Sequence, residues 1–79
     1  MLVMKKAIDQ DTLAALVQTS AVRDFRASRR GEKWQLEARL GGFWLPIRSR
    51  RESVRLWASL TAIGRFCETN GIRALIVEL

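Results

Sequence analysis

Residues 33 to 40 alternate apolar and polar side chains without interruption, and this pattern constrains the fold more than any other. The apolar positions are Trp34, Leu36, Ala38 and Leu40, and the polar positions are Lys33, Gln35, Glu37 and Arg39. A period of two is that of a β-strand with one buried face. The segment therefore predicts a strand that packs its apolar face on a core and turns its polar face to solvent.

Turns on both sides extend this strand into a meander. Ser28 to Glu32 contains a glycine, and Gly41-Gly42 follows the strand, so a tight turn is expected at each end. Residues 22 to 28 and residues 43 to 47 then supply the flanking strands. We expect three antiparallel strands, of which the third lies at an edge or is irregular, because Pro46 has no N–H to donate.

Two helices and a last strand complete the expected elements. Residues 9 to 21 have an apolar stripe at helical spacing, with Asp9 or Asp11 as the N-cap. The order Ser49-Arg50-Arg51-Glu52 matches a capping box, which predicts a long helix over 51 to 68.

Glycines mark the expected packing and end of that helix. Gly64 lies on its apolar stripe, where a glycine favours close approach to a sheet, and Asn70-Gly71 is typical of a left-handed C-cap. Residues 72 to 79 are rich in branched side chains on both faces, so the last strand is expected to be covered on both sides.

These elements predict an α+β fold in one domain spanning residues 1 to 79, with residues 1 to 8 flexible. The order is a short N-terminal helix, a three-stranded antiparallel meander, a long helix packed on the sheet, and a C-terminal strand. A chain of 79 residues has room for one small core.

Composition bears on the chemistry of the chain. It has no histidine and a single cysteine, which excludes His-based acid–base catalysis, an intrachain disulfide and a cysteine-based zinc site. No phosphate-binding loop or metal motif is present. We expect a protein that is not an enzyme and has no cofactor or bound metal. No apolar run is long enough to span a membrane and the start does not read as a secretory signal, so a cytoplasmic location is expected.

The positive charge is concentrated in the middle of the chain. Residues 23 to 55 hold ten of the fourteen basic residues and four of the eight acidic ones, which accounts for the whole net charge of +6. In the expected meander, two loops bring basic side chains to one end of the sheet, beside the start of the long helix. These residues are Arg29, Arg30, Lys33, Arg48, Arg50 and Arg51. Such a rim favours an anionic partner, and a plain solvated surface is the alternative.

The aromatic residues divide between core and surface. Trp34, Phe43 and Trp57 lie on the expected core faces. Trp44 points to the opposite face of its strand, where it either forms a contact surface or is covered by the first helix. We therefore add Trp44 to the candidate partner-binding residues.

The layout of residues 33 to 77 resembles a known family. The Trp34-Gln35-Leu36 strand, a glycine turn, a strand ending in basic residues, an arginine-led helix and a terminal apolar strand opened by Asn70-Gly71-Ile72 are similar to ParC-type plasmid partition-associated small proteins. The resemblance implies a non-enzymatic accessory factor in DNA segregation that acts with a ParA-type Walker ATPase and a ParB-type protein. It carries no binding residue over to this chain.

Two further expectations follow from the residues. The alternative function is a small DNA-binding regulator that uses the same arginine rim, although no helix-turn-helix pattern is evident. The apolar last strand and the thin core also predict a homodimer, because a small domain with an open sheet edge has unpaired strand groups to bury.

Overall fold

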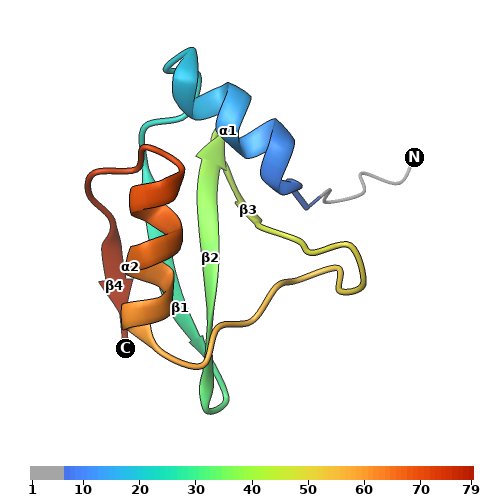
Figure 1. Ribbon diagram of the computed structural model, residues 1–79, viewed down its shortest axis with the longest axis vertical. Helices are drawn as coiled ribbons and strands as arrows, with labels where there is room; N and C mark the ends of the chain where they lie inside the picture. The colour runs from blue at the N-terminus through green and yellow to red at the C-terminus, as the bar shows by residue number, and fades with distance from the viewer. Residues whose placement is uncertain (1–6) are drawn as a thin grey trace.

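A mixed four-stranded sheet with the order β3-β2-β1-β4 organises the chain. The computed structural model describes residues 7–79, in the order α1 (Gln10–Gln18), β1 (Phe25–Arg30), β2 (Lys33–Leu40), β3 (Phe43–Pro46), α2 (Leu60–Thr69) and β4 (Ile76–Glu78). The first three strands are antiparallel, and β4 pairs in parallel with β1 (Figure 1). The predicted α+β fold is confirmed.

The meander follows the alternation in the sequence closely. β2 has the predicted bounds, and β3 lies at one edge of the sheet, where Pro46 needs no donor. Gly41 and Gly42, which connect β2 to β3, adopt φ values of 60° and 84°, as the two central residues of a tight hairpin turn do. β1 begins at Phe25 and continues through Arg30, so its turn to β2 is shorter than expected.

The start of the described chain is tied to the sheet. Ile8 is buried, donates its backbone N–H to the Pro46 carbonyl at 2.9 Å and accepts from the Arg48 N–H at 2.9 Å. The expected flexibility is therefore wrong for Ile8, and residues 1 to 6 lie outside the described residues. Asp9 then caps α1 by accepting from the Thr12 N–H at 2.7 Å.

α2 begins at Leu60, nine residues after the expected start. The Ser49 hydroxyl accepts from the Glu52 N–H at 3.0 Å, but this contact closes an isolated turn. The true cap is Ser59, whose side chain accepts from the Ala62 N–H at 3.2 Å. A local capping signal therefore formed its hydrogen bond without starting a helix.

Burial of Trp57 explains why the segment before α2 is extended. The backbone of Trp57 exchanges two hydrogen bonds with that of Trp34, at 2.8 and 2.9 Å, and the Arg55 N–H donates to the Ile47 carbonyl at 2.8 Å. These long-range contacts replace the helical bonds that residues 51 to 59 would otherwise form. Tertiary packing thus outweighs local propensity here.

The end of α2 confirms the predicted left-handed cap. Gly71 has a φ of 77°, its N–H donates to the Glu68 carbonyl at 3.3 Å, and the Ile72 N–H donates to the Cys67 carbonyl at 2.8 Å. This pair of bonds is a Schellman motif. The expectation for Gly64 is wrong, because a Cβ added there would meet no atom within 4 Å.

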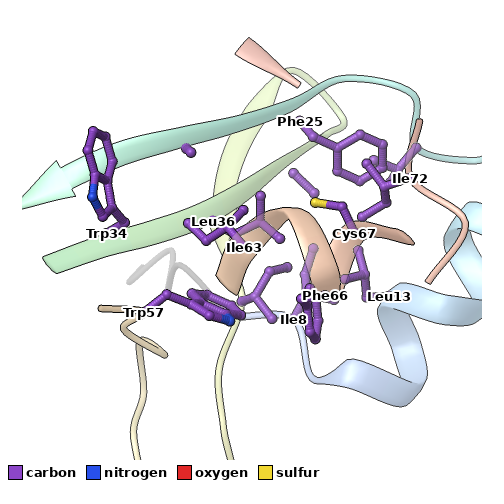
Figure 2. Packing of buried hydrophobic residues seen from close by; sticks show 14 residues of the cluster. Ile8, Leu13, Phe25, Trp34, Leu36, Trp57, Ile63, Phe66, Cys67 and Ile72 are labelled. Atoms are coloured by element: carbon purple, nitrogen blue, oxygen red, sulfur yellow. The ribbon is translucent and has the colours of Figure 1, made fainter. Parts of the chain in front are cut away.

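The core lies between one face of the sheet and both helices. Leu13 of α1 and Ile63 of α2 join the inner-face residues Leu36 and Phe25 in one buried cluster. Figure 2 shows Cys67 on the side of α2 that faces Phe25, while Phe66 points to the side near Leu13. Each helix thus buries one face against the same small core.

The expected aromatic core is correct for two of its three members. Trp34 and Trp57 are buried, at 8% and 6% exposure, whereas Phe43 is 62% exposed. Phe43 is the first residue of edge strand β3 and has only Leu40 opposite it in the sheet. The alternation predicts correctly which face of the sheet Phe43 lies on. It does not predict that few core residues lie beside this end of β3, which leaves the side chain exposed.

The last strand is shorter and more open than expected. β4 has three residues, and Ile76 and Val77 remain 58% and 43% exposed on its two faces. The strand is therefore covered on neither side by the described part of the chain. β4 pairs with β1 along one edge, and its other edge is an apolar edge of the sheet without a neighbouring strand in the described residues.

Candidate functional site

The predicted arginine rim is divided between two places in the structure. Residues 29–33 form the tip of the β1–β2 hairpin, at the bottom of Figure 1, and we call them the hairpin tip. The loop that carries residues 48–51 lies at the right of the same view, away from that tip. The separation follows from the late start of α2, because the loop turns back toward Ile8 instead of entering a helix at the end of the sheet.

Arg48 and Arg50 line a cleft beside the start of α1. Its volume is about 530 Å³, and we call it the arginine cleft. Asp9, Gln10 and Asp11 lie on one wall, and Arg48, Arg50 and Arg55 lie on the other. Arg51 is exposed in the same loop but does not line the cleft.

Backbone pairing fixes the two walls of this cleft. The hydrogen bonds of Ile8 to Pro46 and Arg48 hold the first turn of α1 beside the loop after β3. The Asp9 carboxylate accepts hydrogen bonds from Thr12, which lower its pKa, and the charge of Arg48 adds to that effect. Asp9 therefore stays ionised as the cap of α1, and the cleft carries charges of both signs.

Arg55 is the cleft residue that sequence reasoning misplaced. Its guanidinium carbon lies 4.6 Å from the centre of the Trp57 ring and 5.1 Å from that of Phe66. The two rings meet edge to face, with centroids 5.1 Å apart. The sequence predicts a helix over 51 to 68, which would include Arg55, but in extended backbone its two-residue spacing from Trp57 puts both side chains on one side.

A second cleft adjoins the arginine cleft. Its volume is about 330 Å³, and it is lined by Trp57, Ala62, Arg65, Phe66 and Thr69 together with Gln10 and Arg55. We call it the aromatic cleft. Gln10 and Arg55 line both clefts, so the two open side by side between α1, the loop and α2.

The hairpin tip is partly occupied by contacts within the sheet. The Arg29 guanidinium lies 5.2 Å from the Trp34 ring centre, and Arg30 Nη1 donates to Gln35 Oε1 at 2.7 Å. Lys33 is exposed at the start of β2. Three basic side chains therefore remain at the end of a two-stranded ribbon, two of them oriented by their neighbours.

The outer face of the sheet is polar but not open to solvent as expected. Gln35 and Glu37 are only 9% and 8% exposed. Arg26 Nε donates to Glu37 Oε1 at 2.9 Å, and the Ser28 hydroxyl donates to the same oxygen at 3.0 Å. Long side chains from β1 therefore cover the middle of β2, where the sequence pattern predicted solvent.

Trp44 belongs to this outer face and is half-buried. The guanidinium carbon of Arg26 lies 4.3 Å from the centre of its ring. Arg26 therefore provides the cover that we had considered from the first helix. This contact leaves less of the Trp44 ring for a partner than an uncovered indole would offer.

Glu37 is ionised despite its burial. Burial alone would raise the pKa of this carboxyl, but the hydrogen bonds from Arg26 and Ser28 and the charge of Arg26 outweigh it and lower the pKa. Within residues 7–79, Arg26 is also the one cation with a carboxylate oxygen within 4.0 Å, at Glu37 and, at 3.7 Å, Glu78. The candidate arginines at the hairpin tip and in the arginine cleft have no such partner there.

Comparisons with known proteins assign no family. No family model, curated protein or solved structure matches the chain. Within residues 7–79, no three His, Cys, Asp or Glu side chains gather as a metal site would require. Neither helix of that region has the length and apolar character to cross a membrane.

Proposed function

We propose that this chain is a non-enzymatic accessory protein that binds an acidic partner protein through its arginines. In line with the resemblance to partition-associated proteins, the partner is a ParA-type ATPase, acting in the cytoplasm in DNA segregation together with a ParB-type protein. The proposal concerns a binding module, and the chain contributes no chemistry of its own to the ATPase reaction.

The observation that supports a binding role is the supply of unpaired guanidinium groups. Arg48, Arg50 and Arg51 are exposed and make no ion pair with residues 7–79, in a chain with a net charge of +6. Arginine forms bidentate bonds with carboxylates in a fixed geometry. Arg48 Nε donates to the Ser49 carbonyl at 3.2 Å, and an acidic protein surface would provide the carboxylates that these three guanidinium groups lack within the described chain.

Mixed charge around these arginines favours a protein over a nucleic acid. Asp9 and Asp11 face Arg48 and Arg50 across the arginine cleft, and a continuous row of phosphates would meet these carboxylates as well. α1 has no basic residue, and α2 has Arg65 alone. Neither helix therefore presents the basic face with which a recognition helix enters the major groove.

One feature favours DNA as the second candidate. The hairpin tip carries Arg29, Arg30 and Lys33 at the end of two paired strands. A two-stranded ribbon fits the major groove of B-DNA, and basic side chains at its end contact phosphates. A DNA-binding regulator would therefore use the hairpin tip and not the arginine cleft.

Two sets of substitutions distinguish these functions. The first replaces Arg48, Arg50 and Arg51 by alanine, and the second replaces Arg29, Arg30 and Lys33. We expect the first set to weaken binding to a purified ParA-type ATPase from the same genome at least tenfold, measured by biolayer interferometry. The second set should leave that binding within about twofold and is the matched control, since it removes the same charge.

A mobility shift with duplex DNA is run beside this measurement. Binding to DNA that is lost with the second set, while the ATPase does not bind at all, would refute the proposed function in favour of the alternative. The affinity for DNA should then fall with salt at a log–log slope of about −0.9 for each phosphate contacted. Unchanged binding of both partners in both variants would refute a role for either arginine set.

A further inference from the structure

We infer that the arginine cleft and the aromatic cleft form one composite groove for an extended peptide segment in which an acidic residue stands two positions from an apolar one, so that both side chains lie on the same face. Arg55 binds the carboxylate, and the aromatic cleft takes the apolar side chain. The inference deepens the proposed function, because it rests on a protein partner and names the kind of segment that the partner would offer.

Arg55 is built as a receptor for a single anion. Two aromatic rings hold its guanidinium at 4.6 and 5.1 Å, and the residue is half-buried. No side-chain hydrogen bond or ion pair ties that guanidinium to another residue within 7–79. A guanidinium held over aromatic rings keeps the N–H groups of its own plane free for a carboxylate and is already ordered before a ligand binds.

The apolar half of the groove lies directly beside that receptor. Trp57, Phe66 and Ala62 line the aromatic cleft, which shares Arg55 and Gln10 with the arginine cleft. Side chains two residues apart in an extended peptide lie on the same face, about 6.6 Å apart along the chain. A carboxylate at Arg55 therefore leaves the next side chain on that face within reach of the aromatic rings.

The acidic wall of the arginine cleft selects against a polyanion. Asp9 and Asp11 lie opposite Arg48 and Arg50, and Asp9 is held ionised by its place as the α1 cap. These carboxylates repel a row of adjacent phosphates more strongly than a single carboxylate at Arg55. Charge thus favours a peptide with separated acidic residues over a nucleic acid strand.

Titrations followed by ¹H–¹⁵N NMR test the inference on the whole chain. The first probe is a decapeptide in which glutamate and leucine alternate on one face, with serine at every intervening position, and the second replaces each leucine by serine at equal charge. We expect the first probe to shift the Arg55 Nε–H and Trp57 indole signals in a saturable way. The second should shift Arg55 but bind about tenfold more weakly, because it buries no apolar side chain.

Substitutions in the cleft and one control outside it locate the binding. Arg55→Gln should abolish saturable binding of the first probe, and Arg55→Lys should weaken it at least fivefold because lysine keeps the charge but loses the planar fork. Arg39→Gln is the matched control, since it removes one charge from an exposed arginine that lines neither cleft. If Arg55→Gln disturbs the fold, as its ¹H–¹⁵N spectrum would show, Arg48→Gln removes a charge from the same cleft and should weaken binding at least threefold.

Several results would overturn the inference. Equal affinity for both probes would show that the aromatic cleft takes no side chain. Shifts spread over Arg29, Arg30 and Arg51, or absent altogether, would show that the groove is not the receptor. A duplex DNA of twelve base pairs that shifts the Arg55 signal more strongly than either peptide would assign the groove to nucleic acid. If the groove fails while the ATPase still binds, the proposed function stands and another surface carries it.

Discussion

Replacing Glu37 by alanine tests how the outer face of the sheet is held together. The substitution removes the acceptor of two hydrogen bonds, from Arg26 at 2.9 Å and from Ser28 at 3.0 Å, in the middle of the central strand β2. It leaves a guanidinium over the sheet without its main partner. The carboxylate of Glu78, at 3.7 Å, is the remaining anion within 4.0 Å among the described residues.

The structure sets the size of the effect. Removing one member of a buried ion pair costs about 3–5 kcal/mol because the other charge is left uncompensated. The Arg26 side chain is still 21% exposed, so water and Glu78 solvate part of that charge. We therefore expect a loss of about 2 kcal/mol in the free energy of unfolding, out of a total of about 4–12 kcal/mol for a domain of this size.

Urea denaturation followed by tryptophan fluorescence measures this loss. With a slope of about 1 kcal/mol per molar urea, the midpoint should fall by about 2 M. Glu78→Ala is the matched control, since its carboxylate is 60% exposed and contributes less than about 0.5 kcal/mol. A double-mutant cycle between Arg26→Ala and Glu37→Ala with a coupling below about 0.5 kcal/mol would refute the reasoning.

Further predictions concern pH, backbone, thiol and sheet edge. Because the pKa of Glu37 is lowered in the folded state, the stabilisation that its carboxylate provides is complete above the ordinary pKa of about 4.5 and disappears as the pH falls through the folded pKa. The free energy of unfolding should therefore depend less steeply on acid pH in Glu37→Gln than in the wild type. Gly71→Ala should lower the free energy of unfolding, measured by thermal denaturation, by about 1 kcal/mol because the residue has a φ of 77°. Gly64→Ala lies within a helix with open space around it and should raise that free energy by up to about 1 kcal/mol. A matching loss at both positions would contradict this. Burial raises the pKa of the Cys67 thiol, so a thiol reagent should label it slowly in buffer and quickly in urea, and equal rates would show that the site opens freely. Sedimentation should show a homodimer that Val77→Lys dissociates, and a wild-type monomer at high micromolar concentration would exclude pairing through β4.

Most of the fold could be predicted because its signals are local. The alternation of residues 33 to 40 and the glycine turns define a meander whatever packs on it, and the Gly71 cap depends on the backbone of one residue. The start of α2 could not be predicted in the same way. Ser49 and Glu52 satisfy the local rule for a helix start, yet the pairing of Trp57 with a strand more than twenty residues away decides the segment.

The candidate site was predictable as a set of charges but not as a geometry. Composition identifies Arg48 and Arg50 as parts of a basic surface, and both line the arginine cleft. Their separation from the hairpin tip depends on the path of the loop after β3. Two long-range pairings fix that path, of Ile8 with Pro46 and Arg48 and of Trp57 with Trp34. The sequence places Arg55 on a helix because it does not reveal the pairing of Trp57, so the position of the Arg55 guanidinium over two rings is known only from the structure.

The three tryptophans each lie beneath a different arginine, and this makes the chain its own optical probe. Arg26 covers Trp44, Arg29 covers Trp34 and Arg55 covers Trp57. Each indole reports on a separate region: the outer sheet face, the hairpin and the floor of the groove. Indole emission depends on the charge and the water near the ring. Variants that keep one tryptophan at a time would therefore follow these three regions independently through binding or unfolding, with no label attached.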